Sequence, residues 1–87
     1  MSLVIKRFTA SWCGPCSALA PIMGQVQAEF QGVNFQVIDV DVDTTQAQQY
    51  GVRNIPLVVF IKNGKEVGRL AGVQSKQVYV QAINEWK

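Results

Sequence analysis

Both cysteines of the chain lie in one five-residue stretch, Trp12-Cys13-Gly14-Pro15-Cys16. Two thiols separated by two residues can close a disulfide, bind half of a metal site, or pack as small apolar side chains. Gly14 permits a tight backbone path because it has no Cβ, and Pro15 suits the first turn of a helix but no deeper position. The pattern predicts Cys13 at a helix N-terminus, where unpaired N–H groups and the helix dipole favour a thiolate. Cys16 would follow within the first turn and be less exposed.

Composition narrows the chemistry that this stretch can perform. The chain has 87 residues, enough for a single domain of residues 1–87 with one core, and 48% of them are apolar. A net charge of +2 with mixed signs gives no indication of nucleic acid or membrane binding. Histidine is absent, and no third cysteine exists. A metal site would need two more ligands, so the cysteine pair favours redox chemistry without a bound metal or cofactor.

The N-terminal segment also bears on where such chemistry would take place. Residues 1–7 place their charges, Lys6 and Arg7, after a very short apolar run, which is the reverse of a signal peptide. We therefore expect a cytoplasmic protein. In a reducing compartment a lone Cys-x-x-Cys pair indicates redox or metal chemistry rather than a structural disulfide. A bridge across two residues would also close almost no loop and would constrain the unfolded chain little.

Hydrophobic patterning predicts the strands. Residues 2–9 and 34–42 are rich in β-branched and aromatic residues. Residues 57–62 are almost wholly apolar, as in a strand buried in the middle of a sheet. Asn63-Gly64 is a strong hairpin signal, so residues 65–71 are predicted to return antiparallel.

Three further segments carry helix signals. Apolar residues recur at helical spacing between residues 17 and 30. Thr44 and Thr45 are predicted to cap a short helix that ends near residue 50. Ser75 is predicted to cap a last helix whose apolar residues follow an i, i+3, i+4, i+7 pattern.

The resulting order, β-α-β-α-β-β-α, predicts an α/β fold with a four-stranded mixed sheet and helices on both faces. The first βαβ unit is expected to be a right-handed parallel crossover. The cysteine pair then lies just beyond the carboxyl end of the first strand, where open α/β sheets place their sites. An alternative site, calcium at Asp39, Asp41 and Asp43, fails because Thr44 and Tyr50 stand where an EF-hand loop needs glycine and glutamate.

Four motifs in order resemble the thioredoxin family over essentially the whole chain. They are Trp12-Cys13-Gly14-Pro15-Cys16, the helix segment Ala20-Pro21-Ile22, the segment 50–56 (YGVRNIP) and the hairpin Lys62-Asn63-Gly64, followed by Gly72. The resemblance implies the thioredoxin fold and a cis-proline at Pro56. It also implies that the backbone of Ile55 can pair with an extended substrate and that Gly72 keeps the surface opposite the cysteines flat.

The chain departs from the family pattern at several positions. Thioredoxins usually begin with an extra strand and helix, so the strand at residues 34–42 is expected to form an edge of the sheet. Leu57 stands where a threonine commonly follows the cis-proline. Arg7 replaces a buried aspartate, and Val37 replaces its usual lysine neighbour. Arg7 is expected either to extend along the sheet to water or to point beneath Cys16, where it would need a carboxylate such as Asp39.

The resemblance implies a protein-disulfide reductase in which Cys13 attacks and Cys16 resolves. Gly14 and Pro15 would support the pair, and substrates would dock on Trp12, Ile55, Pro56, Gly72 and Val73. The implied partners are a thioredoxin reductase, which is NADPH-linked, and disulfide-containing substrate proteins; a monomer is expected. Two alternatives remain. A glutaredoxin-like enzyme would use glutathione, although Gly-Pro stands where Pro-Tyr is usual. A thioredoxin-like binding subunit of a larger complex would dispense with catalysis.

Overall fold

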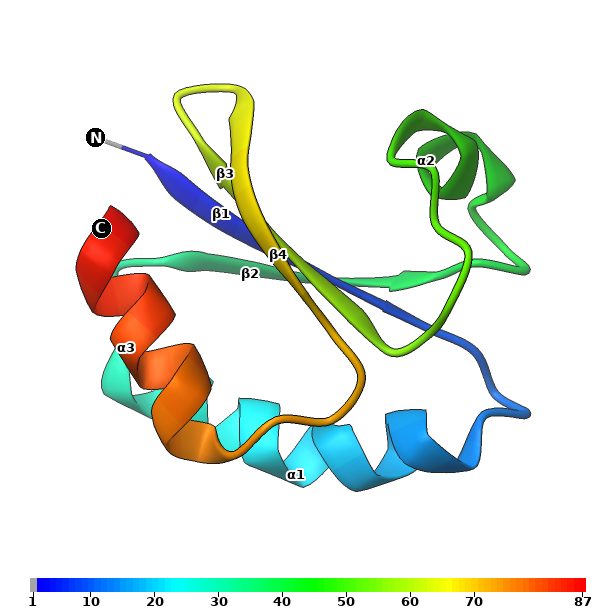
Figure 1. Ribbon diagram of the computed structural model, residues 1–87, viewed down its shortest axis with the longest axis horizontal. Helices are drawn as coiled ribbons and strands as arrows, with labels where there is room; N and C mark the ends of the chain where they lie inside the picture. Colours follow the sequence, from blue (N-terminus) through cyan, green and yellow to red (C-terminus); the bar gives the residue numbers. More distant parts are fainter. Residues whose placement is uncertain (1) are drawn as a thin grey trace.

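The computed structural model describes residues 2–87, and Figure 1 shows how their strands and helices are arranged. The predicted α/β order is confirmed, with helices on both faces of a four-stranded mixed sheet. The elements are β1 (Leu3–Thr9), α1 (Gly14–Glu29), β2 (Asn34–Asp39), α2 (Thr44–Gln49), β3 (Leu57–Lys62), β4 (Lys65–Ala71) and α3 (Lys76–Trp86).

The strands are ordered β2-β1-β3-β4. β1 runs parallel to β2, with Arg7 beside Val37, and antiparallel to β3. β2 is therefore an edge strand, as expected, and β1 and β3 are central. Five of the six residues of β3 are buried, which explains the nearly continuous apolar run in the sequence.

Each face of the sheet carries its own hydrophobic cluster. On the face covered by α1 and α3, Leu19, Tyr79 and Ile83 pack against strand residues such as Ile5. On the other face, Phe8 packs with apolar residues from the segment around α2. These two clusters hold the end of β1 and the start of β3 in place. The cysteine motif follows the end of β1, and the loop with Pro56 leads into the start of β3.

The turn between β3 and β4 forms as the sequence predicts. Asn63 has a φ of 53° and Gly64 a φ of 82°. A tight hairpin turn of this kind needs positive φ at both central residues, which Asn-Gly tolerates better than other pairs. The pairing of β3 with β4 places Leu57 opposite Ala71.

The predicted strand at residues 34–42 is too long by three residues. It ends at Asp39, because the carbonyl of Asp39 accepts the N–H groups of Val42 and Asp43 at 3.1 and 2.8 Å and turns the chain. Val42, the last residue of that predicted strand, has 82% of its surface exposed.

Two of the predicted helix caps also differ from the structure. Asp43, rather than Thr44 or Thr45, caps α2: its Oδ1 accepts the N–H of Gln46 at 3.0 Å. Ser75 stands at the N-cap of α3 with an extended backbone, but its side chain makes no capping hydrogen bond. Among residues 2–87, no helix combines the length and the apolar character that crossing a bilayer would require.

Candidate active site

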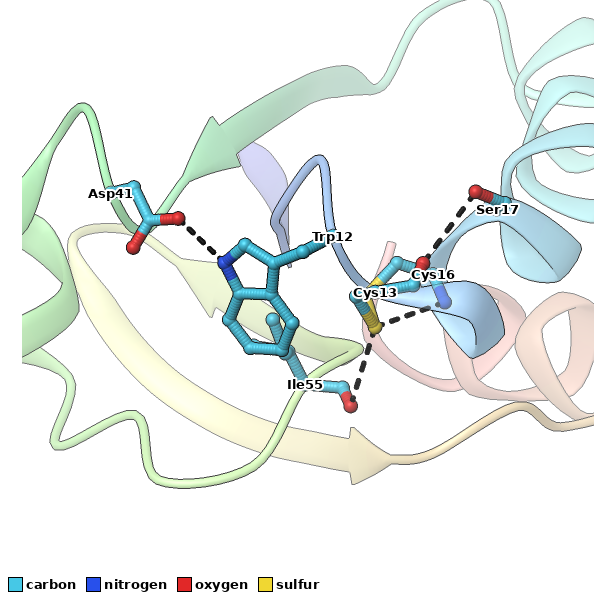
Figure 2. Close-up of a disulfide and its surroundings, with 6 residues drawn as sticks. All are labelled: Trp12, Cys13, Cys16, Ser17, Asp41 and Ile55. Carbon is cyan, nitrogen blue, oxygen red and sulfur yellow. Dashed lines mark hydrogen bonds between the residues drawn. A yellow bond between two sulfur atoms is a disulfide. The ribbon is translucent and has the colours of Figure 1, made fainter.

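The first turn of α1 holds the cysteine pair. Cys13 is the N-cap residue, with extended backbone angles (φ −95°, ψ 109°), and Gly14 and Pro15 open the helix. The N–H of Cys16 donates to Cys13 Sγ at 3.2 Å, as Figure 2 shows. A backbone donor of the first turn is thus aimed at one sulfur, as expected where helical N–H groups lack carbonyl partners.

The two sulfurs are joined as a disulfide, with the Cα atoms 5.2 Å apart. Both residues are buried, Cys13 with 6% and Cys16 with 2% of its surface exposed. The side chains packed around them are apolar: Ala10, Val40 and Ile55. This environment shields the sulfurs from bulk water but leaves Cys13 as the more accessible of the two.

The loop that carries Pro56 comes directly against Cys13. The carbonyl oxygen of Ile55 lies 3.9 Å from Cys13 Sγ, and the Ile55–Pro56 peptide bond is cis. The N–H of Gly72 donates to the carbonyl of Pro56 at 2.9 Å. Three segments far apart in sequence therefore meet at one corner: the cysteine motif, the proline loop and the turn after β4.

The residues around this corner differ in exposure. Trp12 has 69% and Val73 42% of its surface exposed, while Pro56 is buried. Gly72 has a φ of 74°, in the region that favours glycine. The site residues named from the sequence thus belong to the three segments that meet at this corner, and Trp12 and Val73 are the exposed apolar residues among them.

Trp12 has a partner that the sequence did not indicate. Its indole Nε1–H donates to Asp41 Oδ2 at 2.7 Å (Figure 2). The two residues are 29 positions apart, so no local pattern could have paired them. Asp41 lies just beyond the end of β2 and holds the Trp12 ring beside the disulfide.

Arg7 is half-buried on the face of β1 that α1 covers. Burial lowers the pKa of its guanidinium below the usual value, because a cation loses hydration there. It lines a small cavity of about 70 Å³ with Ala20, Met23 and Gln27. These α1 residues follow Cys16 by one to three turns, so the cavity extends toward the middle of the helix.

The suggested pairing of Arg7 with Asp39 is wrong. Within residues 2–87 the ion pairs are Arg69–Glu66 and Lys76–Glu29. The carboxylate of Asp39 instead accepts the N–H of Asp41 at 2.9 Å. Within this described part of the chain Arg7 therefore makes no ion pair, and it lies in the cavity beside α1.

A second acidic residue after β2, Asp43, binds the backbone at the start of α2. Asp43 caps α2, and hydrogen bonds from the backbone N–H and the side chain of Gln46 lower its pKa below the usual value. Throughout residues 2–87, no three His, Cys, Asp or Glu side chains come together in a way that could hold a metal ion.

The sequence of the chain is similar to those of known proteins. The thioredoxin family model matches residues 1–85. Thioredoxin from Chlamydia caviae is 39% identical over 83 residues, covering 95% of this chain and 81% of that protein. Thioredoxin H-type 1 from Nicotiana tabacum is 42% identical over 76 residues, covering 87% and 60%.

Two similar solved structures are thioredoxins, as the sequence relatives are. The X-ray structure of Fasciola hepatica thioredoxin superposes with a TM-score of 0.92 at 37% identity and covers 99% of this chain and 82% of that one. Thioredoxin from Nicotiana alata gives a TM-score of 0.93 at 35% identity, with 99% and 74% covered. With these relatives and a Cys13–Cys16 pair at disulfide distance, the protein is a thiol–disulfide oxidoreductase that acts on protein disulfides, and the chain belongs to the thioredoxin family.

Proposed function

We propose that the protein works as a reductase, with Cys13 as the attacking and Cys16 as the resolving thiol. The Cys13 thiolate attacks one sulfur of a substrate disulfide, forms a mixed disulfide and releases the other sulfur as a thiolate. The Cys16 thiolate then attacks Cys13 Sγ, releases the second substrate thiolate and closes the Cys13–Cys16 bond. Two electrons pass to the substrate, and the released thiolates take up protons from water.

The observation that carries these roles is the hydrogen bond from the N–H of Cys16 to Cys13 Sγ at 3.2 Å. A hydrogen bond to the charged form of a group favours that form, and Cys13 also lies at the positive end of the dipole of α1. Among residues 2–87 no comparable donor reaches Cys16 Sγ, and Cys16 is the less exposed of the two residues. The two cysteines therefore differ in the direction that the attacking and resolving roles require.

Substrate docking is proposed on the exposed corner around the disulfide. Trp12 and Val73 supply exposed apolar contacts, Gly72 keeps the approach open, and the Ile55–Pro56 backbone lies beside Cys13. An extended chain that pairs with exposed backbone gains affinity from main-chain hydrogen bonds and tolerates many sequences. Gly14 and Pro15 support the site by shaping the first turn of α1.

The electrons are proposed to come from a thioredoxin reductase supplied by NADPH, with no cofactor bound to this chain and with the cytoplasm as its compartment. The experiment is an NADPH-oxidation assay with a protein disulfide such as insulin, run once with thioredoxin reductase and once with glutathione and glutathione reductase. We expect turnover with the first system. Turnover with glutathione alone would assign a glutaredoxin-like activity, and no turnover in either would favour the binding-subunit alternative.

A further inference from the structure

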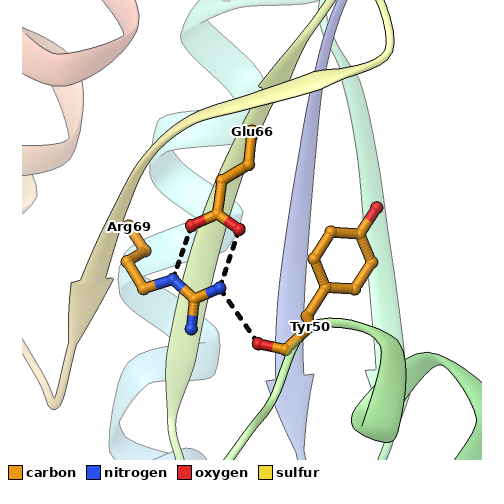
Figure 3. A network of polar contacts seen from close by, with 3 residues as sticks. All are labelled: Tyr50, Glu66 and Arg69. Atoms are coloured by element: carbon orange, nitrogen blue, oxygen red, sulfur yellow. Dashed lines mark hydrogen bonds and ion pairs between the residues drawn. The ribbon is translucent and has the colours of Figure 1, made fainter.

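Arg69 on β4 is held in one orientation. Its Nε and Nη2 donate to the two carboxylate oxygens of Glu66 at 2.6 and 2.7 Å, and Nη2 also donates to the carbonyl of Tyr50 at 3.0 Å (Figure 3). The bond to Glu66 raises the pKa of Arg69 and lowers that of Glu66. Tyr50 is the C-cap of α2 and begins the segment that leads to Pro56. The guanidinium is thus fixed to both β4 and the proline loop.

One donor group of Arg69 remains available. Within residues 2–87, Nη1 has no hydrogen-bond partner, and Figure 3 shows it directed away from Glu66 and Tyr50. Arg53 is exposed and likewise makes no ion pair or side-chain hydrogen bond in the described part of the chain. Arg53, Asn54 and Arg69 line one hollow of about 210 Å³, and no acidic residue lines it.

This hollow adjoins the proposed docking corner. Asn54 directly precedes Ile55, whose carbonyl lies 3.9 Å from Cys13 Sγ. Ala71, which also lines the hollow, directly precedes Gly72. An extended chain advances about 3.3 Å per residue. A substrate side chain about two to four residues from the attacked cysteine can therefore reach the hollow.

We propose that Arg53, Asn54 and Arg69 form a subsite for a carboxylate side chain of the protein substrate, a proposal that rests on the proposed function. A carboxylate accepts several hydrogen bonds, and a guanidinium is the donor best matched to its geometry. Glu66 neutralises one of the two guanidinium groups, so the hollow keeps one net positive charge. Fixing Arg69 in advance reduces the side-chain entropy that binding must remove.

The test uses disulfide peptides that carry one Glu, moved from the second to the fourth residue on either side of the attacked cysteine. Matched peptides carry Gln instead. We expect Glu to raise kcat/KM about two- to fivefold over Gln at positions on one side only, as fits one partly exposed ion pair. The ratio should approach one in 1 M NaCl, where charges are screened within about 3 Å.

Variants separate a local subsite from general attraction. Arg53→Gln should bring the Glu/Gln ratio close to one, whereas Lys65→Gln, the same charge change at the opposite end of β4, should leave the ratio as it is. Equal ratios at every position, no preference for Glu, or an equal effect of Lys65→Gln would overturn the proposal.

A binding measurement keeps this proposal distinct from the reductase activity. Peptides with serine in place of cysteine are titrated into the oxidised protein, and the NMR signals of the Arg53 and Arg69 Nε–H groups are followed. Tighter binding of the Glu peptide, with shifts at both arginines, supports the subsite even if no peptide is reduced. Turnover of both peptides without such shifts supports the reductase and contradicts the subsite.

Discussion

Trp12 and Asp41 are joined side chain to side chain, with the indole Nε1–H 2.7 Å from the carboxylate Oδ2, across 29 positions of sequence. Trp12 directly precedes Cys13, and Asp41 lies in the turn that follows β2. The hydrogen bond links the cysteine motif to the edge of the sheet and holds an exposed aromatic ring beside the disulfide.

Asp41→Ala should slow the reduction of protein substrates more than it lowers stability. The bond is exposed, so its loss should change the free energy of unfolding by less than about 1 kcal/mol. The freed ring should lower kcat/KM for insulin severalfold, because the docking surface is no longer set in advance. Asp41→Asn keeps an acceptor oxygen and is the control. Loss of more than half the stability, or no change in kcat/KM, would contradict this role.

Substitution of each cysteine should stop the reaction at a different step. Cys13→Ser should abolish reduction, because the sulfur that accepts the N–H of Cys16 is lost. Cys16→Ser should still attack and then stop as a mixed disulfide. Mass spectrometry of the trapped complex should find the substrate bonded to Cys13. A stable adduct on Cys16 in Cys13→Ser, with none on Cys13 in Cys16→Ser, would reverse the assignment.

Two glycines should respond oppositely to alanine. At Gly72 the φ of 74° makes a Cβ unfavourable although no atom lies within 4 Å, so Gly72→Ala should cost about 1 kcal/mol. Gly24 lies inside α1, also with no atom within 4 Å, and Gly24→Ala should raise stability by about 0.5–1 kcal/mol. Urea unfolding measures both. The same sign for both variants would show that backbone conformation does not govern these sites.

Tyr79 should make stability fall at high pH. Its hydroxyl accepts the N–H of Gln74 at 3.1 Å and donates to the carbonyl of Gly72 at 3.3 Å, and burial raises its pKa. The unfolded state then releases this proton at lower pH than the folded state, so stability is full below about pH 10 and decreases above it. Tyr79→Phe should cost about 1–2 kcal/mol at neutral pH and flatten the alkaline decrease. An unchanged pH slope in the variant would rule out this assignment.

Arg7 should affect the pH dependence of the resolving step, in which the substrate is released from its mixed disulfide with Cys13. No acidic residue lines the cavity beside Arg7, and a guanidinium does not accept a proton. We expect release of substrate from the Cys13 mixed disulfide to follow a single thiol titration, with water or hydroxide as the proton acceptor. In Arg7→Asp a second, carboxylate-linked step should appear. Stopped-flow measurements across pH provide the test, and two titrations in the wild type or identical profiles would refute it.

Local signals predicted most of the fold. Asn63-Gly64 predicted the hairpin because the turn's positive φ angles are a property of those two residues. The apolar run of β3 predicted a central strand because burial on both faces leaves no alternation. The Gly14-Pro15 pair predicted the start of α1 for a similarly local reason.

What the sequence did not predict depends on distant contacts or on competition between neighbours. Trp12 contacts Asp41 across 29 positions, and Arg69 contacts the carbonyl of Tyr50 across 19, so both contacts depend on the tertiary fold. Asp43 and Thr44 are both good capping residues, and the turn at Asp39 decides in favour of Asp43. Sequence patterns describe the preferences of each segment but not which segments become neighbours.

The hollow of about 390 Å³ at the other end of the sheet is lined by both Leu3 and Lys87. Figure 1 shows the start of β1 and the end of α3 on this side, away from the start of α1. The first strand and the last helix therefore meet far from the sulfurs. A circular permutation that links Ser2 to Lys87 and opens the chain at the exposed Asn63–Gly64 turn would leave the disulfide corner intact.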